Sequence, residues 1–315
     1  MGYSLENSKV NKTFFTWDID YRCNYNCTYC FLHFEPETTD IKAEYLKPTE
    51  WINIWEEIYK RHGDCHISVT GGEPFIYPNF IEIISELSKI HTFEFSTNFS
   101  WDIDYFVKKI APERVIINSS FHPEFTGIKK FLERFFFLKE KKYLISITIV
   151  AYPPMLEKIL DYKEVFEKKG IRIIFFPYRG PYRGKKYPEG YTEIEKKLLK
   201  QLEVNVGVGI TAELNETYVP NHKEVSLGEK KLCRMGQSYA KIVPSGDAYR
   251  CCAAVNKDWG RLGNIINNTF SLLNEPEYCP DFRHCSCYKA MIITEEEKWL
   301  KHWIVPCAAT EKQNK

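Results

Sequence analysis

The sequence predicts an α/β fold, a barrel or incomplete barrel of βα units followed by a small α+β domain. Up to about residue 190, short apolar runs alternate about six times with amphipathic segments. Repeated βα units require right-handed crossovers and therefore a parallel sheet. Beyond residue 190 the alternation stops, and a chain of 315 residues is long enough for one large domain and a smaller one.

The predicted strands are short apolar runs, and amphipathic segments with helical spacing separate them. The strands are expected at residues 14–19, 66–70, 93–97, 114–120, 143–150 and 171–176. Helices are expected at 48–63, 78–89, 101–110, 125–140 and 155–169. The first helix has Thr49 as its expected N-cap and Gly63 at its end.

The region after the barrel has a different character. Residues 191–202, "YTEIEKKLLKQL", predict a linking helix, and 240–252, "AKIVPSGDAYRCC", predict a β-hairpin that turns at 244–247. The expected boundaries are 1–190 for the barrel, 191–232 for the linking helix and connection, and 233–315 for the C-terminal domain.

Charge and hydropathy exclude two classes of partner. Lys and Arg number 43 against 42 Asp and Glu, so no global field recruits nucleic acid or an acidic membrane. No run of about 18 apolar residues occurs, and the first 15 residues lack the apolar core of a signal peptide. We therefore expect a cytoplasmic protein without a nucleic-acid or membrane partner.

Eleven cysteines in a reducing compartment indicate metal binding or catalysis rather than disulfides. Three lie between residues 23 and 30, Cys65 stands alone, none occurs from 66 to 232, and seven lie between 233 and 307. This distribution predicts two metal-bearing regions separated by a metal-free scaffold. Cys65, at the start of the second strand, is most simply a core residue.

The first cysteine group, "CNYNCTYC", has the spacing C-x3-C-x2-C at Cys23, Cys27 and Cys30, directly after the first strand. A structural zinc site normally needs four protein ligands, and His33 could complete a Cys3His set. An iron–sulfur cluster is the alternative, and three thiolates would leave one iron of a four-iron cluster open. In a barrel, this loop falls on the face where the strands end and where the chemistry is found.

A second motif, "TGGEP" (Thr70 to Pro74), follows the second strand. Its two glycines allow close backbone approach to a ligand, Pro74 stiffens the exit, and Glu73 supplies a carboxylate. Alone it is a weak signal, because a Gly-Gly pair after a strand is more often a simple turn.

Together the two motifs closely resemble the radical S-adenosylmethionine (radical SAM) superfamily, over residues 14 to about 177. The resemblance implies a partial (βα)6 TIM-like barrel in which Cys23, Cys27 and Cys30 hold a [4Fe–4S] cluster. S-adenosylmethionine would chelate the open iron and, on reduction by an external donor such as flavodoxin or ferredoxin, yield a 5′-deoxyadenosyl radical. The combined motifs favour this interpretation over zinc, and His33 is then a loop residue near the cofactor.

The resemblance also implies the residues that bind S-adenosylmethionine. Gly71, Gly72, Glu73 and Pro74 would contact its methionyl amino group, and Tyr29 would lie by the adenine. Polar groups for its carboxylate and ribose are expected where the third and fourth strands end, at Ser96, Thr97, Asn98, Ser119 and Ser120. For each of these five side chains, strand-end capping is the alternative.

The C-terminal cysteines resemble the SPASM and twitch extensions that carry auxiliary [4Fe–4S] clusters. Cys233 and Cys251 have the matching spacing around Gly246, but the later pattern is incomplete, since Pro276 stands where a cysteine is expected. We predict one auxiliary cluster held by Cys233, Cys251 and two of Cys279, Cys285 and Cys287. The leftover thiols, with Cys252 and Cys307 among the candidates, are either buried small hydrophobes or, as in radical SAM epimerases, hydrogen donors to a substrate radical.

The substrate is expected to meet the loop after the sixth strand, "YRGPYRGKKYP" at 178–188. Arg179 and Arg183 suit phosphate or carboxylate, and the interleaved tyrosines suit sugar or base faces, although a solvated linker is the alternative. We predict oxidation or epimerisation of an anionic small molecule such as a sugar derivative. His122 and Glu124, just after the fourth strand, are candidate proton acceptors or else surface loop residues.

Two other functions stay open on the sequence. The first is epimerisation or thioether or carbon–carbon crosslinking of a ribosomally made peptide. Because the first strand begins at Phe14, a peptide-recognition domain would then have to be a separate protein. The second is a non-enzymatic zinc or iron–sulfur protein, in which "TGGEP" would be a coincidence.

Overall fold

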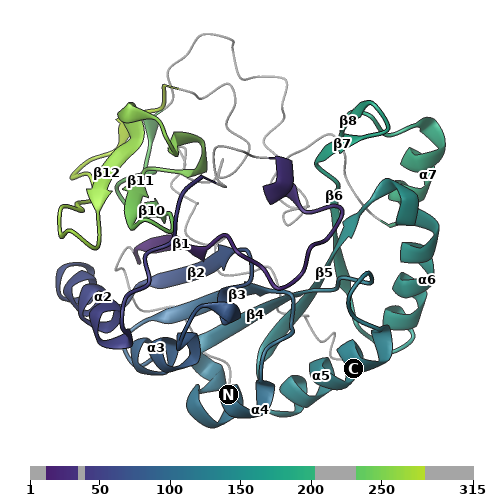
Figure 1. Ribbon diagram of the computed structural model, residues 1–315, viewed down its shortest axis with the longest axis horizontal. Helices are drawn as coiled ribbons and strands as arrows, with labels where there is room; N and C mark the ends of the chain where they lie inside the picture. Colours follow the sequence, from purple (N-terminus) through teal and green to yellow (C-terminus); the bar gives the residue numbers. More distant parts are fainter. Residues whose placement is uncertain (1–11, 35–39, 203–231, 281–315) are drawn as a thin grey trace, which may run out of the picture.

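The computed structural model describes residues 12–34, 40–202 and 232–280 of the chain. Nine of the strands in these ranges form a single curved sheet in the order β12-β11-β10-β1-β2-β3-β4-β5-β6 (Figure 1). The six strands from β1 to β6 run parallel, and they are β1 (Phe14–Asp20), β2 (His66–Gly71), β3 (Thr92–Thr97), β4 (Val115–Ser120), β5 (Leu144–Ala151) and β6 (Ile173–Pro177). The predicted partial barrel is confirmed.

Helices between successive strands cover the outer side of this sheet (Figure 1). They are α2 (Pro48–His62), α3 (Phe80–Leu87), α4 (Ile103–Lys109), α5 (Ile128–Glu140) and α6 (Leu156–Glu167). All five were expected from the sequence, and Gly63 does end α2 in the left-handed region, at φ 70°.

The predicted N-cap of α2 is wrong. The helix begins at Pro48 with Lys47 as its N-cap, so Thr49 is already helical. Proline is favoured in the first helical turn because its φ is preset, and the Glu50 carboxylate accepts the backbone N–H of Lys47 at 2.7 Å. The helix start therefore depends on Pro48 and Glu50 rather than on a threonine hydroxyl.

The two faces of the sheet differ in chemistry. On the outer face of β1, Phe15 and Trp17 are buried, and the Trp17 ring lies 4.9 Å from Trp51 and 5.2 Å from Trp55 of α2. On the inner face of the same strand, Asp18 pairs with Lys241 at 2.5 Å. Strand alternation thus separates an apolar core under the helices from a polar barrel interior.

The C-terminal strands extend the barrel sheet. Strand β10 (Tyr239–Ile242) runs parallel to β1, with Phe14 opposite Tyr239 and Trp17 opposite Ile242. The predicted hairpin is confirmed, because β10 turns into the antiparallel β11 (Asp247–Tyr249), which pairs with β12 (Arg261–Asn264). The domain boundaries at 190 and 232 stay predictions, since this hairpin and the barrel share one sheet.

Two short antiparallel pairs of strands and one further helix lie outside this sheet. Strands β7 (Gly180–Tyr182) and β8 (Lys185–Tyr187) form a hairpin that the sequence analysis did not predict. The predicted linking helix is α7 (Glu193–Gln201), capped by the Thr192 hydroxyl. Strands β9 (Leu232–Cys233) and β13 (Glu277–Tyr278) pair antiparallel. Among the helices described, none has the length and apolarity needed to cross a membrane.

His91 links α2 to the start of β2 and is fully buried. Its Nδ1 accepts the backbone N–H of Cys65 at 3.1 Å, and its Nε2 donates to the carbonyl of Trp55 at 3.2 Å. This pattern requires a neutral ring. Burial accordingly lowers the pKa of His91 below 6.5. Cys65 is buried beside it, as predicted.

Replacement of His91 by Phe should lower the free energy of unfolding of the metal-free protein by about 1–3 kcal/mol, because two hydrogen bonds are lost. The wild type should also lose stability from about pH 7.5 to pH 5.5, since the unfolded chain binds a proton that folded His91 refuses. Urea unfolding at the two pH values should show a smaller loss of unfolding free energy for the variant than for the wild type. Replacement of the exposed His33 by Phe is the control, and it should lose as much unfolding free energy between the two pH values as the wild type. A loss in His91→Phe as large as in the wild type would contradict the assignment of a neutral His91 ring.

Candidate functional site

The loop after β1 and the turn after β2 are joined by their backbones. The N–H of Gly72 donates to the carbonyl of Asp20 at 2.9 Å, and the N–H of Glu73 donates to that of Arg22 at 3.0 Å. A Cβ on Gly71 would lie 2.2 Å from the Asp20 oxygen, and one on Gly72 would lie 2.0 Å from the Arg22 oxygen. Both glycines are needed because the backbone of the cysteine loop occupies that space.

Asp20 fixes the start of the cysteine loop. Its carboxylate accepts the backbone N–H of Arg22 at 3.0 Å, the Arg22 Nε at 2.9 Å and the Tyr45 hydroxyl at 2.8 Å. The Arg22 guanidinium in turn lies 4.8 Å from the centre of the Tyr45 ring. This group of Asp20, Arg22 and Tyr45 was not among the residues predicted from the sequence. The polar residues at alternate positions 16, 18 and 20 of an apolar strand were its signal.

The three cysteines of this loop have different surroundings. Cys23 is exposed and accepts the backbone N–H of Tyr25 at 3.4 Å, Cys27 is buried, and Cys30 is partly buried. Burial, with the neighbouring Cys30 and Cys23 thiols, raises the pKa of Cys27 to about 12. Three thiols on one short loop fit the chemistry of an iron–sulfur cluster, which would have to displace their protons. Among the described residues, no three His, Cys, Asp or Glu side chains are gathered closely enough to hold a metal ion as they stand.

Glu73 is fully buried behind this loop. Its carboxylate accepts the backbone N–H of Asn98 at 2.6 Å, the hydroxyl of Thr97 at 2.8 Å and the backbone N–H of Phe75 at 3.2 Å. Burial raises the pKa of Glu73 to about 7, although the three hydrogen bonds it accepts act to lower it. The structure thereby brings together the turn after β2 and the end of β3, two places where cofactor-binding residues were predicted.

Asn98 continues this connection to the first cysteine. Its Nδ2 donates to Asn24 Oδ1 at 2.7 Å and to Cys23 Sγ at 3.5 Å. The predicted Ser96 is partly buried on the inner face of β3. The hydroxyl of Ser119 donates to the Ser146 carbonyl of the neighbouring β5 at 2.6 Å, and the predicted cofactor-binding roles of Ser96 and Ser119 stay predictions.

His122 and Glu124 both contact the cysteine loop. The Glu124 carboxylate accepts the backbone N–H of Thr28 at 3.0 Å and its hydroxyl at 2.5 Å. His122 Nδ1 lies 3.4 Å from Cys27 Sγ and 3.1 Å from the hydroxyl of Tyr29. These contacts hold the loop between Cys27 and Cys30, while the predicted roles of the two residues as proton acceptors stay predictions.

Tyr29 is buried at the back of the same loop, and its ring stacks on His122 with centroids 5.8 Å apart. Burial lowers the pKa of His122 to about 4, so its ring is neutral at physiological pH. The ring of Tyr152, which directly follows β5, also packs against Tyr29, with centroids 5.4 Å apart. The position of Tyr29 by the adenine of a cofactor stays a prediction.

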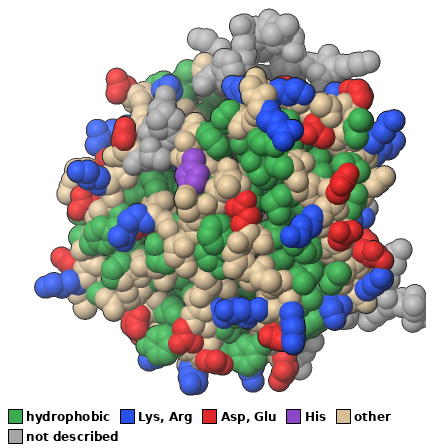
Figure 2. All heavy atoms as spheres, turned by 45° about the vertical axis from the view of Figure 1, so that its right-hand side comes forward, with side chains coloured by type: hydrophobic (Ala, Val, Ile, Leu, Met, Phe, Trp, Pro, Cys, Tyr) green, Lys and Arg blue, Asp and Glu red, His purple; other side chains and the backbone are tan. Residues whose placement is uncertain are grey.

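Arg179 is exposed at the end of β6, where it leads into the β7–β8 hairpin. The hairpin lies beside the short helix η1 (Phe31–Phe34) that follows Cys30, and the Phe34 ring lies 6.4 Å from Tyr178. Figure 2 shows Lys and Arg side chains at the upper edge of this side of the molecule, over an area of hydrophobic side chains. The predicted substrate segment and the cysteine loop are therefore neighbours.

Three of the C-terminal cysteines come together at the other end of β1. Cys233, Cys251 and Cys279 share one apolar cluster with Phe14 and Tyr239. Burial raises the pKa of Cys251 to about 12, while the backbone N–H groups of residues 253 and 254 face its thiol and lower it. Cys285, Cys287 and Cys307 lie outside the described residues.

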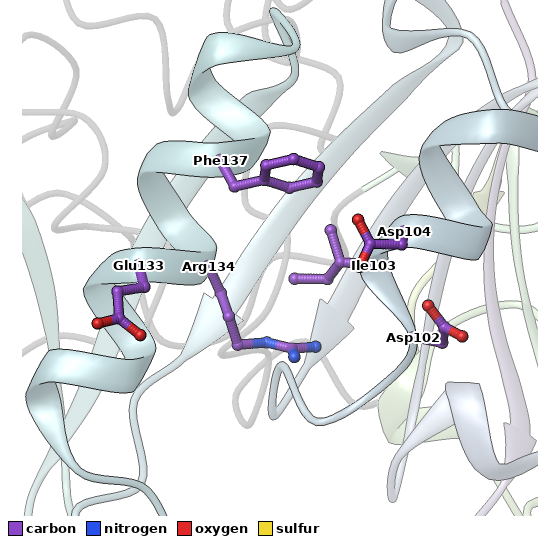
Figure 3. Close-up of a pocket in the computed structure, with 6 residues that line it drawn as sticks. All are labelled: Asp102, Ile103, Asp104, Glu133, Arg134 and Phe137. Atoms are coloured by element: carbon purple, nitrogen blue, oxygen red, sulfur yellow. The ribbon is translucent and has the colours of Figure 1, made fainter.

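A separate groove of about 420 Å³ lies on the outer side, between α4 and α5. Its lining residues are Asp102, Ile103, Asp104, Glu133, Arg134 and Phe137 (Figure 3). It contains none of the predicted site residues. The candidate site is therefore the cysteine loop with the ends of β2, β3 and β4.

The family model of the radical SAM superfamily matches residues 19–118. This span contains both the cysteine loop and the turn after β2. The chain carries a radical SAM domain.

Similarity to known proteins continues past this domain. The cysteine-type anaerobic sulfatase-maturating enzyme of Clostridium perfringens (strain 13 / Type A) is 23% identical over 89% of this chain and 84% of its own length. The structure of anSMEcpe with bound AdoMet and the Cp18Cys peptide has a TM-score of 0.56 at 19% identity, over 81% of this chain and 78% of that one. Streptococcus suis SuiB, solved with its precursor peptide SuiA, has a TM-score of 0.53 at 17% identity, over 82% of this chain.

The chain spans 65% of the length of SuiB, and at these identities the structural likeness shows the fold alone. The predicted class, a radical SAM domain with a SPASM or twitch-type C-terminal region, is confirmed, because the similar proteins match on both sides of residue 190. The predicted cofactors, [4Fe–4S] clusters and S-adenosylmethionine, are those of this class of radical SAM proteins.

Gly72→Ala should displace the cysteine loop, because a methyl group would lie 2.0 Å from the Arg22 carbonyl. Iron content after anaerobic reconstitution should fall by about four per chain. Formation of 5′-deoxyadenosine should fall about a hundredfold, since misplacement by an ångström is enough for such a loss.

Gly127→Ala is the matched control, because nothing lies within 4 Å of its added Cβ. It should retain wild-type iron and activity. Wild-type iron in Gly72→Ala would show that the close backbone contact does not set the loop.

Proposed function

We propose that this radical SAM enzyme reductively cleaves S-adenosylmethionine and uses the 5′-deoxyadenosyl radical to modify a peptide. The observation that carries the radical SAM part is the continuous contact from Glu73 through Asn98 to Cys23. It places a buried carboxylate of the glycine-rich turn and the first cysteine of the loop at one site. The non-enzymatic alternative leaves this contact unexplained.

The protein's own residues would hold and shield the reactants. Cys23, Cys27 and Cys30 would ligate three irons of the cluster, and the Gly71–Pro74 turn would face the methionyl group. When bound, the cluster and S-adenosylmethionine supply an electron and the 5′-deoxyadenosyl group for hydrogen abstraction. Tyr29 and neutral His122 would keep water from the Cys27 side, because both rings are packed against it.

Two observations support a peptide substrate. The similar proteins of known name include a sulfatase-maturating enzyme and SuiB, which was solved with a precursor peptide. In addition, the β7–β8 hairpin exposes Arg183, Lys185 and Lys186, and its strand β7 contacts η1, which exposes the rings of Phe31 and Phe34. An extended surface of cations and aromatic rings suits a peptide that carries acidic residues. Oxidation or epimerisation of a sugar derivative stays a prediction without such support.

The C-terminal region would hold one auxiliary [4Fe–4S] cluster. Cys233 and Cys251 are its proposed ligands, with two of Cys279, Cys285 and Cys287. An external one-electron donor such as flavodoxin or ferredoxin would reduce the enzyme. The auxiliary cluster could then accept an electron from the substrate radical or orient the substrate.

Anaerobic reconstitution with iron and sulfide tests the enzyme class. The wild type should bind about eight irons and form 5′-deoxyadenosine after reduction. The triple variant Cys23→Ala/Cys27→Ala/Cys30→Ala should retain about four irons and form none. Zinc in place of iron, or no cleavage by any preparation, would exclude the radical SAM activity.

Charge reversal of Arg179 and Arg183 tests the substrate class. The double variant Arg179→Glu/Arg183→Glu should bind a fluorescein-labelled peptide of alternating Glu and Gly about tenfold more weakly, measured by fluorescence anisotropy. The loss should shrink at high salt, since both cations are exposed. Basal formation of 5′-deoxyadenosine should be unchanged.

Arg172→Glu is the control for this test, because exposed Arg172 precedes β6 at the opposite end of the strand. It should bind the peptide as the wild type does. Equal binding by the double variant would remove the support for an acidic peptide. Turnover of a sugar phosphate but of no peptide would favour the small-molecule prediction.

A further inference from the structure

We propose that Arg250 is a positioning residue that brings Cys233, Cys251 and Cys279 together, and that Cys279 is the third ligand of the auxiliary cluster. The inference rests on the proposed auxiliary cluster and deepens it. Its basis is that one buried guanidinium bonds to the two chain segments that carry Cys233 and Cys279, and itself precedes Cys251.

Arg250 is 4% exposed, and its three side-chain nitrogens all have acceptors. Nε donates to the carbonyl of Met235 at 3.1 Å, two residues after Cys233. Nη1 donates to the Glu277 carboxylate at 2.8 Å and Nη2 to the Glu277 carbonyl at 3.3 Å, two residues before Cys279. The planar fork of an arginine suits this set of acceptors, whereas the single ammonium of a lysine cannot match its geometry.

The backbone supports the same convergence. Strands β9 and β13 pair with Cys233 opposite Glu277, so Cys279 follows directly after the paired segment. The N–H of Arg250 donates to the carbonyl of Gly260 at 2.7 Å, which fixes the residue before Cys251. The packing agrees, because Cys251 and Cys279 both lie against the cluster that contains Cys233.

The turn after Cys233 is shaped around the arginine side chain. Gly236 has φ 94°, and a Cβ there would lie 2.8 Å from Arg250 Cγ. The N–H of Met235 donates to Cys233 Sγ at 3.5 Å, so the turn also aims a backbone donor at the thiol. A buried cation beside a set of thiolates lowers the cost of their negative charge and influences the potential of the cluster they hold.

The test uses the full chain with Cys23→Ala/Cys27→Ala/Cys30→Ala, in which any iron belongs to the auxiliary site. This background should hold about four irons after reconstitution and show the EPR signal of a reduced cluster. Arg250→Met and Cys279→Ser should each reduce the iron to below about one per chain. Arg250→Lys, which retains the charge but not the fork, should retain part of the iron with a shifted midpoint potential.

Two further variants separate positioning from simple folding. Arg261→Met removes an ion pair between the neighbouring strands β12 and β11, with Asp247 at 2.8 Å, and should leave iron, EPR signal and potential unchanged. Glu277→Gln keeps the backbone acceptors of Arg250 but removes the charge of the pair, and it should shift the potential without loss of the fold, checked by circular dichroism.

Full iron with an unchanged EPR signal in Arg250→Met would overturn the role of Arg250. The same result in Cys279→Ser would overturn the ligand assignment. If the background holds no iron, the proposed auxiliary cluster fails and this inference fails with it. If the wild type binds its iron but forms no 5′-deoxyadenosine, that result counts against the proposed radical chemistry alone and leaves this inference standing.

Discussion

The close backbone contact between the ends of β1 and β2 is the constraint on which the site depends. Gly71 and Gly72 meet the carbonyls of Asp20 and Arg22 so closely that no other residue fits. The register between β1 and β2 shifts between Asp18 and Asp20, which turns the cysteine loop away from regular pairing just where the contact begins. The cysteine loop and the turn that carries Glu73 are therefore fixed relative to each other, and a ligand that bridges them meets a preformed arrangement.

The interior of the barrel imposes a second requirement, since its polar groups are buried and must be paired. Asp18 accepts the Thr70 hydroxyl and forms the ion pair with Lys241, which comes from β10. His66 bonds to Glu94, which in turn accepts from Asn118. The C-terminal strand thus supplies the cation that Asp18 needs, so the barrel interior is complete only when the C-terminal region is docked.

The sequence predicted those parts of the fold that depend on interactions between residues close together in the chain. The six strands followed from their apolar runs, and the hairpin followed from its Pro-Ser-Gly-Asp turn. Thr49 was the wrong N-cap because a preset proline and an acceptor at Glu50 outweighed a hydroxyl. Contacts between distant segments left no such signal: Glu124 holds Thr28 across 96 residues, and Tyr239 bonds to Thr16 across 223. The pairing of β10 with β1 is of this kind, so it could not be read from spacing.

That pairing sets the distance between the two cysteine regions. Phe14, at the start of β1, lies in the apolar cluster with Cys233, Cys251 and Cys279, whereas Asp20, at its end, anchors the loop of Cys23, Cys27 and Cys30. A strand of 7 residues rises about 3.3 Å per residue, so its ends are about 20 Å apart. The inner face of β1 spans this distance, with Thr16 and Asp18 bonded to Tyr239 and Lys241 of β10. Thr16 and Asp18 are both buried, so the protein's own side chains fill this face, and β1 separates the two cysteine regions by its full length.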